Sequence, residues 1–292
     1  MVSGSIFYNR QGHTSVVFNN NIWVLGGINY SDPFTPASAV HYNDAWYSAD
    51  GISWTQEAIA TPYGARVCHS SVVFNGKLWV IAGDDGSNFL NDVWYSEDGA
   101  NWNLATASAE FSARYGHTSL VFNNEMWVIG GWDGSSHKND IWHSTNGINW
   151  TREATAGIFS PRAFHASLVF DNKMWVIAGS NGSYSFNDVW YSNDGSDWRL
   201  SNASAEFGSR EGFSCLSFDN KIFVIGGFVS DPYGYSNDVW YSYDGLNWIR
   251  ATAAADFSAR YVHSSVVFDN KMWVMGGYDG SGQPLCDIWH SP

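Results

Sequence analysis

Positively charged residues are scarce in this sequence, which has 14 Lys plus Arg against 28 Asp plus Glu. The formal net charge is −14, and charged residues make up 14 % of the chain, against about 25 % in an ordinary soluble domain. An acidic chain repels the phosphate backbone of DNA and RNA. We therefore expect no nucleic-acid partner.

Cysteines and long apolar runs are also lacking. The three cysteines, Cys68, Cys215 and Cys286, are an odd and sparse set, so they indicate no disulfide framework. No apolar run approaches the roughly 18 residues of a membrane span, and the longest, MWVIAG at 174–179, has the length of a strand. We expect no membrane partner and a monomeric protein.

Aromatic residues, in contrast, make up 17 % of the chain and include 17 Trp. Few charges combined with many Trp, Tyr, Ser, Asn and Gly are typical of secreted β proteins. The first residues, MVSGSIFYNR, lack the apolar core of a signal peptide, so an export signal is either absent or has been removed. The composition favours a secreted or extracytoplasmic location.

One string recurs through the whole chain. NDVWYSEDGANW at 91–102 has close copies at 43–54, 139–150, 187–198 and 237–248, and a sixth copy begins at 286. His117 and His165 hold the same place in neighbouring copies and lie 48 residues apart; the first copy is eight residues longer and the fifth is two residues longer. A fixed period of this size indicates a repeat architecture.

Each copy contains four short apolar runs separated by Asn-Gly, Asp-Gly or Gly-Gly, which predict antiparallel strands and hairpins. Four strands repeated six times predict an all-β, six-bladed β-propeller formed as one domain over 1–292. The repeats run approximately over 10–56, 66–104, 114–152, 162–200, 210–250 and 260–292. Seven residues of the period are missing at the chain ends. We therefore expect either a last blade without its outermost strand or a chain trimmed from a longer one.

The repeat resembles the Kelch family. Each copy begins with Arg-x-x-His or its variant, followed by an apolar strand, a Gly-Gly or Ala-Gly doublet, and a spaced Tyr and Trp. The resemblance covers the whole chain. The segment SxDGxxW also resembles the Asp-box turn of sialidase propellers, shortened by one residue. The resemblance implies four-stranded blades, with the Asp-box-like turn between the third and fourth strands.

The variable segments of a propeller indicate where a ligand binds, because binding residues concentrate on loops held by a rigid scaffold. The segments after the doublets vary most, with insertions at 28–42 and 228–236. They lie on what we call the loop face, opposite the two uniform hairpin turns of each copy.

Sixteen of the 17 Trp occupy strand positions, and Trp132 is left on a loop. Candidate ligand-binding aromatics on this face are Trp132, Tyr115, Tyr184, Tyr233, Tyr235 and Tyr278. The alternative is that these aromatics pack the loops onto the blades.

Six arginines recur three residues before the His position. They are Arg10, Arg66, Arg114, Arg162, Arg210 and Arg260. The Kelch resemblance implies that arginines at this position make the contacts in Kelch proteins that bind acidic peptides, so they are candidate ligand-binding residues. If they are free to bind ligand, at least half should expose their guanidinium groups. The alternative is a structural pairing with the six recurring aspartates, which are Asp44, Asp92, Asp140, Asp188, Asp238 and Asp287.

We predict no metal site, cofactor or catalytic residue. Five His recur once per copy, without the close pairing of typical His metal sites. Glu211 interrupts the repeat beside Arg210 and is either a general base or a neutral variation.

The sequence favours a binding module that recognises a glycan or an acidic or polar peptide on the loop face. The alternatives are an enzyme acting on an acidic sugar, similar to sialidases or sialic-acid epimerases, and a structural or engineered scaffold without a ligand. If Trp132 binds ligand, Trp132→Ala should weaken binding and change stability by only about 0.5 kcal/mol. Trp127→Ala, at a strand position, should instead cost about 3–5 kcal/mol of stability.

Overall fold

The computed structural model describes residues 7–30, 39–154 and 158–292. In these ranges the chain forms 26 β-strands, and no helix there could cross a membrane. The strands build six antiparallel sheets, numbered here as blades 1 to 6 in chain order, and one separate hairpin. The chain divides into unit 1, Met1–Tyr115 with Val262–Pro292, and unit 2, Gly116–Tyr261.

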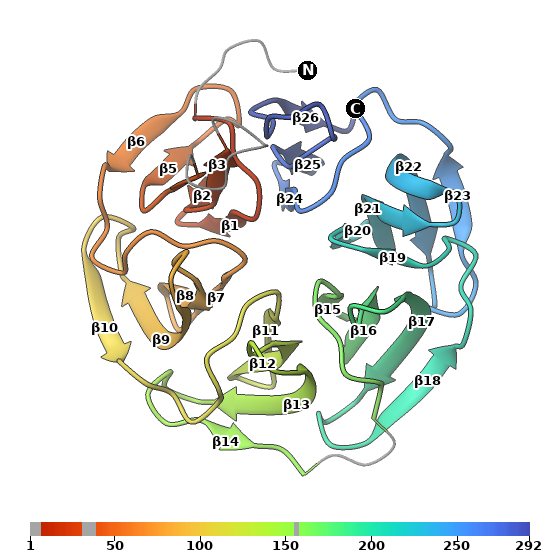
Figure 1. Cartoon of the computed structure of the whole chain (residues 1–292), viewed down its shortest axis with the longest axis horizontal. Coiled ribbons are helices and arrows are strands. Elements are labelled where there is room, and N and C mark those ends of the chain that lie inside the picture. Colours follow the sequence, from red (N-terminus) through yellow and green to blue (C-terminus); the bar gives the residue numbers. More distant parts are fainter. Residues whose placement is uncertain (1–6, 31–38, 155–157) are drawn as a thin grey trace. The chain divides into compact units, whose positions relative to one another are not determined.

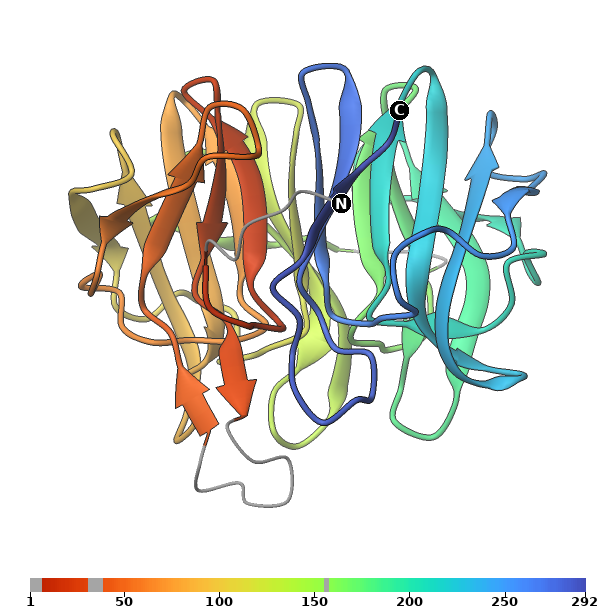
Figure 2. The same ribbon diagram turned by 90° about the horizontal axis from the view of Figure 1, so that it is seen from above.

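Unit 1 contains blades 1, 2 and 6. Blade 1 has β1 (Thr14–Phe18), β2 (Asn21–Leu25), β5 (Ala45–Ser48) and β6 (Thr55–Ala58). Blade 2 has β7 (Ser70–Phe74), β8 (Lys77–Asp84), β9 (Phe89–Ser96) and β10 (Trp102–Thr106). Blade 6 has β24 (Ser264–Phe268), β25 (Lys271–Met275) and β26 (Ile288–His290). In Figure 2 the separate hairpin, β3 (Ile28–Tyr30) with β4 (Ala39–His41), projects beyond the blade 1 sheet.

Unit 2 contains blades 3, 4 and 5. Blade 3 has β11 (Thr118–Phe122), β12 (Glu125–Trp132), β13 (His137–Ser144) and β14 (Thr151–Arg152). Blade 4 has β15 (Ala166–Phe170), β16 (Lys173–Ser180), β17 (Ser185–Ser192) and β18 (Trp198–Asn202), which follow one another in chain order across the sheet (Figure 1). Blade 5 has β20 (Ser214–Phe218), β21 (Lys221–Ser230), β22 (Tyr233–Ser242) and β23 (Ile249–Thr252), and the short β19 (Arg210–Glu211) also pairs with β21.

The hairpin between the first two strands of a blade is a two-residue turn. In blade 3, Phe122 pairs with Glu125, so Asn123 and Asn124 form the turn, with φ of 50° and 61°. Two successive positive φ angles define a type I′ turn, which matches the twist of a hairpin, and Asn tolerates them better than most residues. The Asn-rich turns of the sequence thus fix the register of each blade.

The hairpin between the third and fourth strands is closed by side chains. In blade 2 the Ser96 hydroxyl accepts the N–H of Gly99 at 2.7 Å, and Asp98 Oδ1 accepts the N–H groups of Ala100 and Asn101 at 2.9 and 2.8 Å. The bonds from Asn101 are the main reason why the pKa of Asp98 falls to about 2. The Trp102 indole N–H then donates to the Gly99 carbonyl at 2.9 Å. This explains why Ser, Asp, Gly and Trp recur together.

Neighbouring blades share apolar cores. In unit 2, Trp127 and Ile129 of blade 3 pack in one cluster with Met174, Val176 and Trp198 of blade 4. In unit 1, Trp23 of blade 1 packs with residues of blade 2 in the same way. A buried Trp removes about 150–250 Å² from water. Within each unit these neighbouring blades bury each other's faces, so their repeats stabilise one another.

The Gly-Gly and Ala-Gly doublets bend the ends of the second strands. In blade 3 the register of β12 and β13 shifts between Ile129 and Gly131, around Gly130 with φ 60°. The N–H of Gly131 then donates to the carbonyl of Arg162, in the next copy, at 2.8 Å. The doublet is therefore a bulge that ties one copy to the next at the loop face.

The architecture is an all-β, six-bladed β-propeller of antiparallel blades, as predicted. Five sheets have at least four strands, and blade 6 has three strands among the described residues, in line with a last blade lacking its outermost strand. In blades 2 to 4 the second and third strands are eight residues long, and in blade 5 they are ten residues long, which exceeds the short apolar runs of the sequence. Residues 31–38 of the predicted insertion at 28–42 lie outside the described residues. The assignment of 1–292 to one domain stays a prediction.

Candidate functional site

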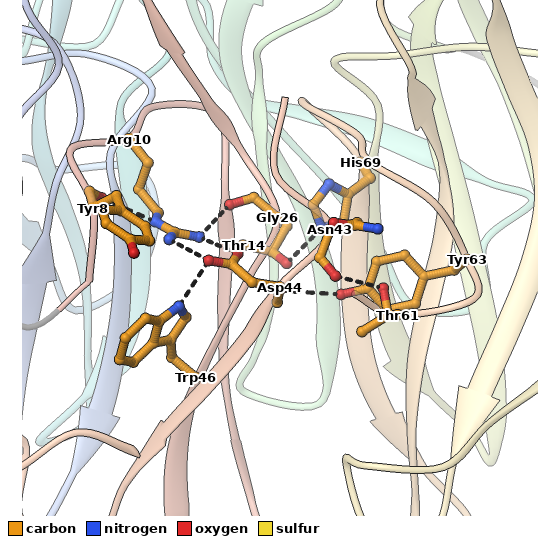
Figure 3. A network of polar contacts seen from close by, with 10 residues as sticks. All are labelled: Tyr8, Arg10, Thr14, Gly26, Asn43, Asp44, Trp46, Thr61, Tyr63 and His69. Atoms are coloured by element: carbon orange, nitrogen blue, oxygen red, sulfur yellow. Dashed lines mark hydrogen bonds and ion pairs between the residues drawn. The ribbon is translucent and has the colours of Figure 1, made fainter. Parts of the chain in front are cut away.

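The arginine that precedes each His lies inside its blade rather than on its surface. Arg10 is fully buried, and its Nη1 and Nη2 donate to the two carboxylate oxygens of Asp44 at 2.7 and 2.8 Å (Figure 3). Nη1 also donates to the Gly26 carbonyl at 2.7 Å, and the Trp46 indole N–H donates to Asp44 at 2.8 Å. This two-bond pairing occupies the guanidinium face that a ligand carboxylate would need.

The same pairing recurs in other copies. Arg66 pairs with Asp92 at 2.9 Å, Arg162 with Asp188 at 2.6 Å, and Arg210 with Asp238 at 2.8 Å. Burial alone would raise the pKa of Asp238, but the hydrogen bonds and charge of Arg210 outweigh it and lower that pKa.

Arg114 and Arg260 are also fully buried, and their Nε groups donate to the carbonyls of Ser112 and Ser258 at 3.0 Å each. If the six arginines were free to bind ligand, at least half should expose their guanidinium groups. That expectation is wrong, because all six are at most 1 % exposed. In four copies the recurring aspartate binds the guanidinium, as the structural alternative proposed.

The His side chains join neighbouring copies. His69 Nε2 lies 3.0 Å from the hydroxyl of Thr14, and His165 Nε2 lies 2.9 Å from that of Thr118. Burial, helped by the charge of Arg162, holds the pKa of His165 well below its usual value, so the ring is neutral at pH 7. Among the described residues no three His, Cys, Asp or Glu side chains could together hold a metal ion.

A backbone hydrogen bond also crosses between copies one residue before the His. In unit 2 the Phe164 N–H donates to the Gly116 carbonyl at 2.8 Å, and the Gly212 N–H donates to the Phe164 carbonyl at 2.9 Å. Phe164 adopts a φ of 53°, which is rare for a bulky residue. The loop face therefore stands on a firmly connected backbone.

Two of the predicted tyrosines on the loop face are strongly exposed, and both belong to unit 2. Tyr184 is 59 % exposed and lies just before β17, where its ring meets Phe186 edge-on at 5.1 Å. Tyr233 is 83 % exposed, begins β22 and meets Phe228 edge-on at 4.7 Å. They stand where the second and third strands connect, as predicted, although Tyr233 is on a strand rather than a loop.

Trp132 also differs from its predicted place, because it is the last residue of β12 and not a loop residue. It pairs across the hairpin with His137, and the two ring centres lie 4.6 Å apart. The indole is half-buried. It is therefore partly accessible to a ligand.

The other three predicted tyrosines are half-buried. Tyr115 contacts Phe89, with ring centres 4.9 Å apart, and burial together with Cys68 and Asp84 raises the pKa of its hydroxyl. Tyr235 lies on β22 and stacks on Tyr261 at 5.2 Å. Tyr278 forms an isolated backbone bridge with Pro284. The structure thus groups Tyr233 with Tyr235 in blade 5 and leaves Tyr115 and Tyr278 in unit 1.

Glu211 lies beside Phe228, whose ring contacts the blade 5 tyrosines Tyr233 and Tyr235. It is half-buried, it pairs across the strands with Phe228, and its carboxylate receives a hydrogen bond from the hydroxyl of Ser180 in blade 4. Burial raises the pKa of Glu211, although the bond from Ser180 acts in the opposite direction. The sequence singled out Glu211 but could not identify Ser180, which lies 31 positions earlier in the preceding copy.

Unit 1 also contains a shallow cavity of about 450 Å³. Its walls include Pro62, Leu90 and Trp94, together with the buried Arg66–Asp92 pair. None of the predicted aromatic residues lines it.

The geometry of the repeat agrees with the comparison with protein families. Residues 12–227 match the KLHDC2/KLHL20/DRC7 Kelch-repeats domain, and residues 259–290 match the Kelch motif. The chain belongs to the Kelch-repeat family. Kelch propellers are typically protein-interaction modules. No curated protein matches this chain.

Proposed function

We propose that this Kelch propeller is a binding module that recognises a polar peptide on the loop face of unit 2. The observation that carries the proposal is the pair of exposed tyrosines, Tyr184 and Tyr233, at equivalent connections of neighbouring blades. Large aromatic rings left in water at one end of rigid sheets offer contact area at little cost in conformational entropy. The half-buried Trp132 stands at the matching connection of blade 3.

A peptide suits these positions better than a strongly anionic ligand. The six arginines that would have bound an acidic ligand are buried, and four are held by aspartates. The same finding weakens the alternative of an enzyme for an acidic sugar, which requires arginines free to hold a carboxylate. The likeness of the SxDGxxW hairpins to sialidase Asp-boxes stays a prediction. Those hairpins lie at the opposite end of the strands from the exposed tyrosines and are not part of the proposed site.

The test is a parallel peptide and glycan array, followed by affinity measurement for the best ligands. Tyr233→Ala and Trp132→Ala should each weaken peptide binding about fivefold or more, as expected for aromatic interface residues. The matched control is Tyr243→Ala, because Tyr243 is also exposed but lies at the hairpin end of β22. Equal effects of Tyr233→Ala and Tyr243→Ala, or binding to glycans alone, would contradict the proposal.

A further inference from the structure

Among the described residues, no cationic side chain partners the partly buried carboxylate of Glu211. In the part of the chain that the structure describes, its polar contact is the hydrogen bond from the Ser180 hydroxyl. The neighbouring Arg210 is not available to it, since that guanidinium binds Asp238 and the carbonyl of Gly226. A carboxylate can accept about four hydrogen bonds, so most of the acceptor capacity of Glu211 is left for a ligand.

A cluster of aromatic rings begins at the cross-strand neighbour of Glu211. The aromatic cluster consists of Phe228, Tyr233, Tyr235 and Tyr261. Phe228 is the direct cross-strand partner of Glu211, and directly opposed residues of an antiparallel pair have their Cβ atoms about 4.5–5.5 Å apart. Phe228 contacts Tyr233 at 4.7 Å and Tyr235 at 5.6 Å.

An arginine side chain can bind both a carboxylate and aromatic rings. Its planar guanidinium binds a carboxylate through two parallel hydrogen bonds and also stacks on aromatic faces. We propose that Glu211 and the aromatic cluster bind an arginine side chain of the peptide ligand. This inference rests on the proposed function and names the chemistry of its partner.

The repeat itself offers an internal comparison. At the position that follows the conserved Arg, the other copies carry Gln11, Val67, Tyr115, Ala163 and Tyr261, so only blade 5 has a carboxylate there. Ala163 pairs with Ser180 as Glu211 pairs with Phe228, which shows that the strand pairing needs no acidic side chain. The carboxylate is therefore a local feature and not part of the blade scaffold.

The experiment uses peptide libraries in which one fixed position is either arginine or the neutral isostere citrulline. Wild-type protein should bind the arginine peptides at least tenfold more tightly, and Glu211→Gln should remove that preference. Glutamine keeps the acceptor for Ser180 and removes the charge. The matched control is Asp219→Asn, which removes an exposed carboxylate from the turn at the other end of β21 and should leave the preference unchanged.

A second measurement makes the result independent of the peptide. Saturation-transfer NMR with N-acetylarginine amide should give a signal with wild-type protein and none with Glu211→Gln, while circular dichroism shows that the variant is folded. Peptides that bind equally well with citrulline would overturn the arginine site and leave the peptide module intact. If the amide gives a Glu211-dependent signal but no peptide binds, the arginine site stands and the peptide function is wrong. If neither probe binds, both proposals are wrong.

Discussion

A buried arginine needs hydrogen-bond partners for its donors, and the recurring Arg–Asp pair supplies two of these bonds within one copy. In blade 4 the Arg162 guanidinium contacts Asp188 and the carbonyls of Ser160 and Ala178. These contacts connect the loop before the first strand to the second and third strands. The pair thus holds the loop in place, and its loss would leave an uncompensated charge in the interior.

Removal of the carboxylate from this pair should therefore destabilise the protein. We expect Asp188→Asn to lower the free energy of unfolding by about 3–5 kcal/mol, because Arg162 would stay buried without its counter-charge. The measurement is urea denaturation at pH 7. The control is Asp197→Asn in the same blade, which breaks the exposed pair with Arg199 at 2.8 Å and should cause no measurable change. Similar losses in the two variants would show that burial of the pair does not matter.

The residue scale also shows what spacing along the chain predicts and what it does not. The recurrence of Arg and Asp predicted two outcomes, a ring of exposed donors or internal pairs, and only packing decides between them. Trp132 was identified as unlike the other Trp, but its half-buried place against His137 depends on how far β12 extends. The contact between Ser180 and Glu211 joins two copies, and a pattern within one copy cannot reveal it.

At the level of the element, the hairpin of one copy fits a tryptophan of the preceding copy. A Cβ atom added to Gly99 of blade 2 would lie 2.0 Å from the Trp23 ring of blade 1, and one added to Gly195 of blade 4 would lie 2.4 Å from the Trp127 ring of blade 3. The glycine is required for two reasons, since its φ of 88° at position 99 is also unfavourable for other residues. The strands were predictable from their alternation and turns, whereas this contact between copies was not.

We therefore expect Gly99→Ala to destabilise the protein by about 2–4 kcal/mol, from an unfavourable φ and a clash with a packed indole. Gly76 of the same blade has a φ of 67° and no atom within 4 Å of an added Cβ. Gly76→Ala should thus cost only about 1 kcal/mol, the conformational part of the effect. Thermal and urea denaturation of both variants measure the difference. Equal losses of stability in the two variants would mean that the contact between Gly99 and Trp23 does not contribute to the effect.

At the level of the whole molecule, the excess of acidic residues affects how partners approach. The net charge of −14 creates a field that attracts cations over about a Debye length, which is roughly 30 Å at 0.01 M salt and less than 10 Å at physiological salt. A basic peptide is thus steered toward the protein before it contacts any particular residue. From the acidic composition one can predict that anionic ligands are repelled. The composition does not predict where a cationic ligand binds.

For an arginine-containing peptide ligand, the association rate constant should fall about tenfold or more as salt rises from roughly 0.01 to 0.3 M. Stopped-flow fluorescence measures this rate directly. Glu211→Gln should mainly raise the dissociation rate and change the salt dependence of association little, because it removes one negative charge of many. An association rate independent of salt would contradict long-range steering.

The match between the glycine of one hairpin and the tryptophan of the preceding copy has a consequence for the history of such chains. Every copy that carries both residues offers its glycine to the preceding copy and its tryptophan to the following copy. Any such copy can therefore follow any other. Gene duplication could lengthen an array of this kind by whole copies without inventing a new contact surface. Segments outside this contact are then free to differ between copies, and Glu211, which one copy carries, is a difference of this sort.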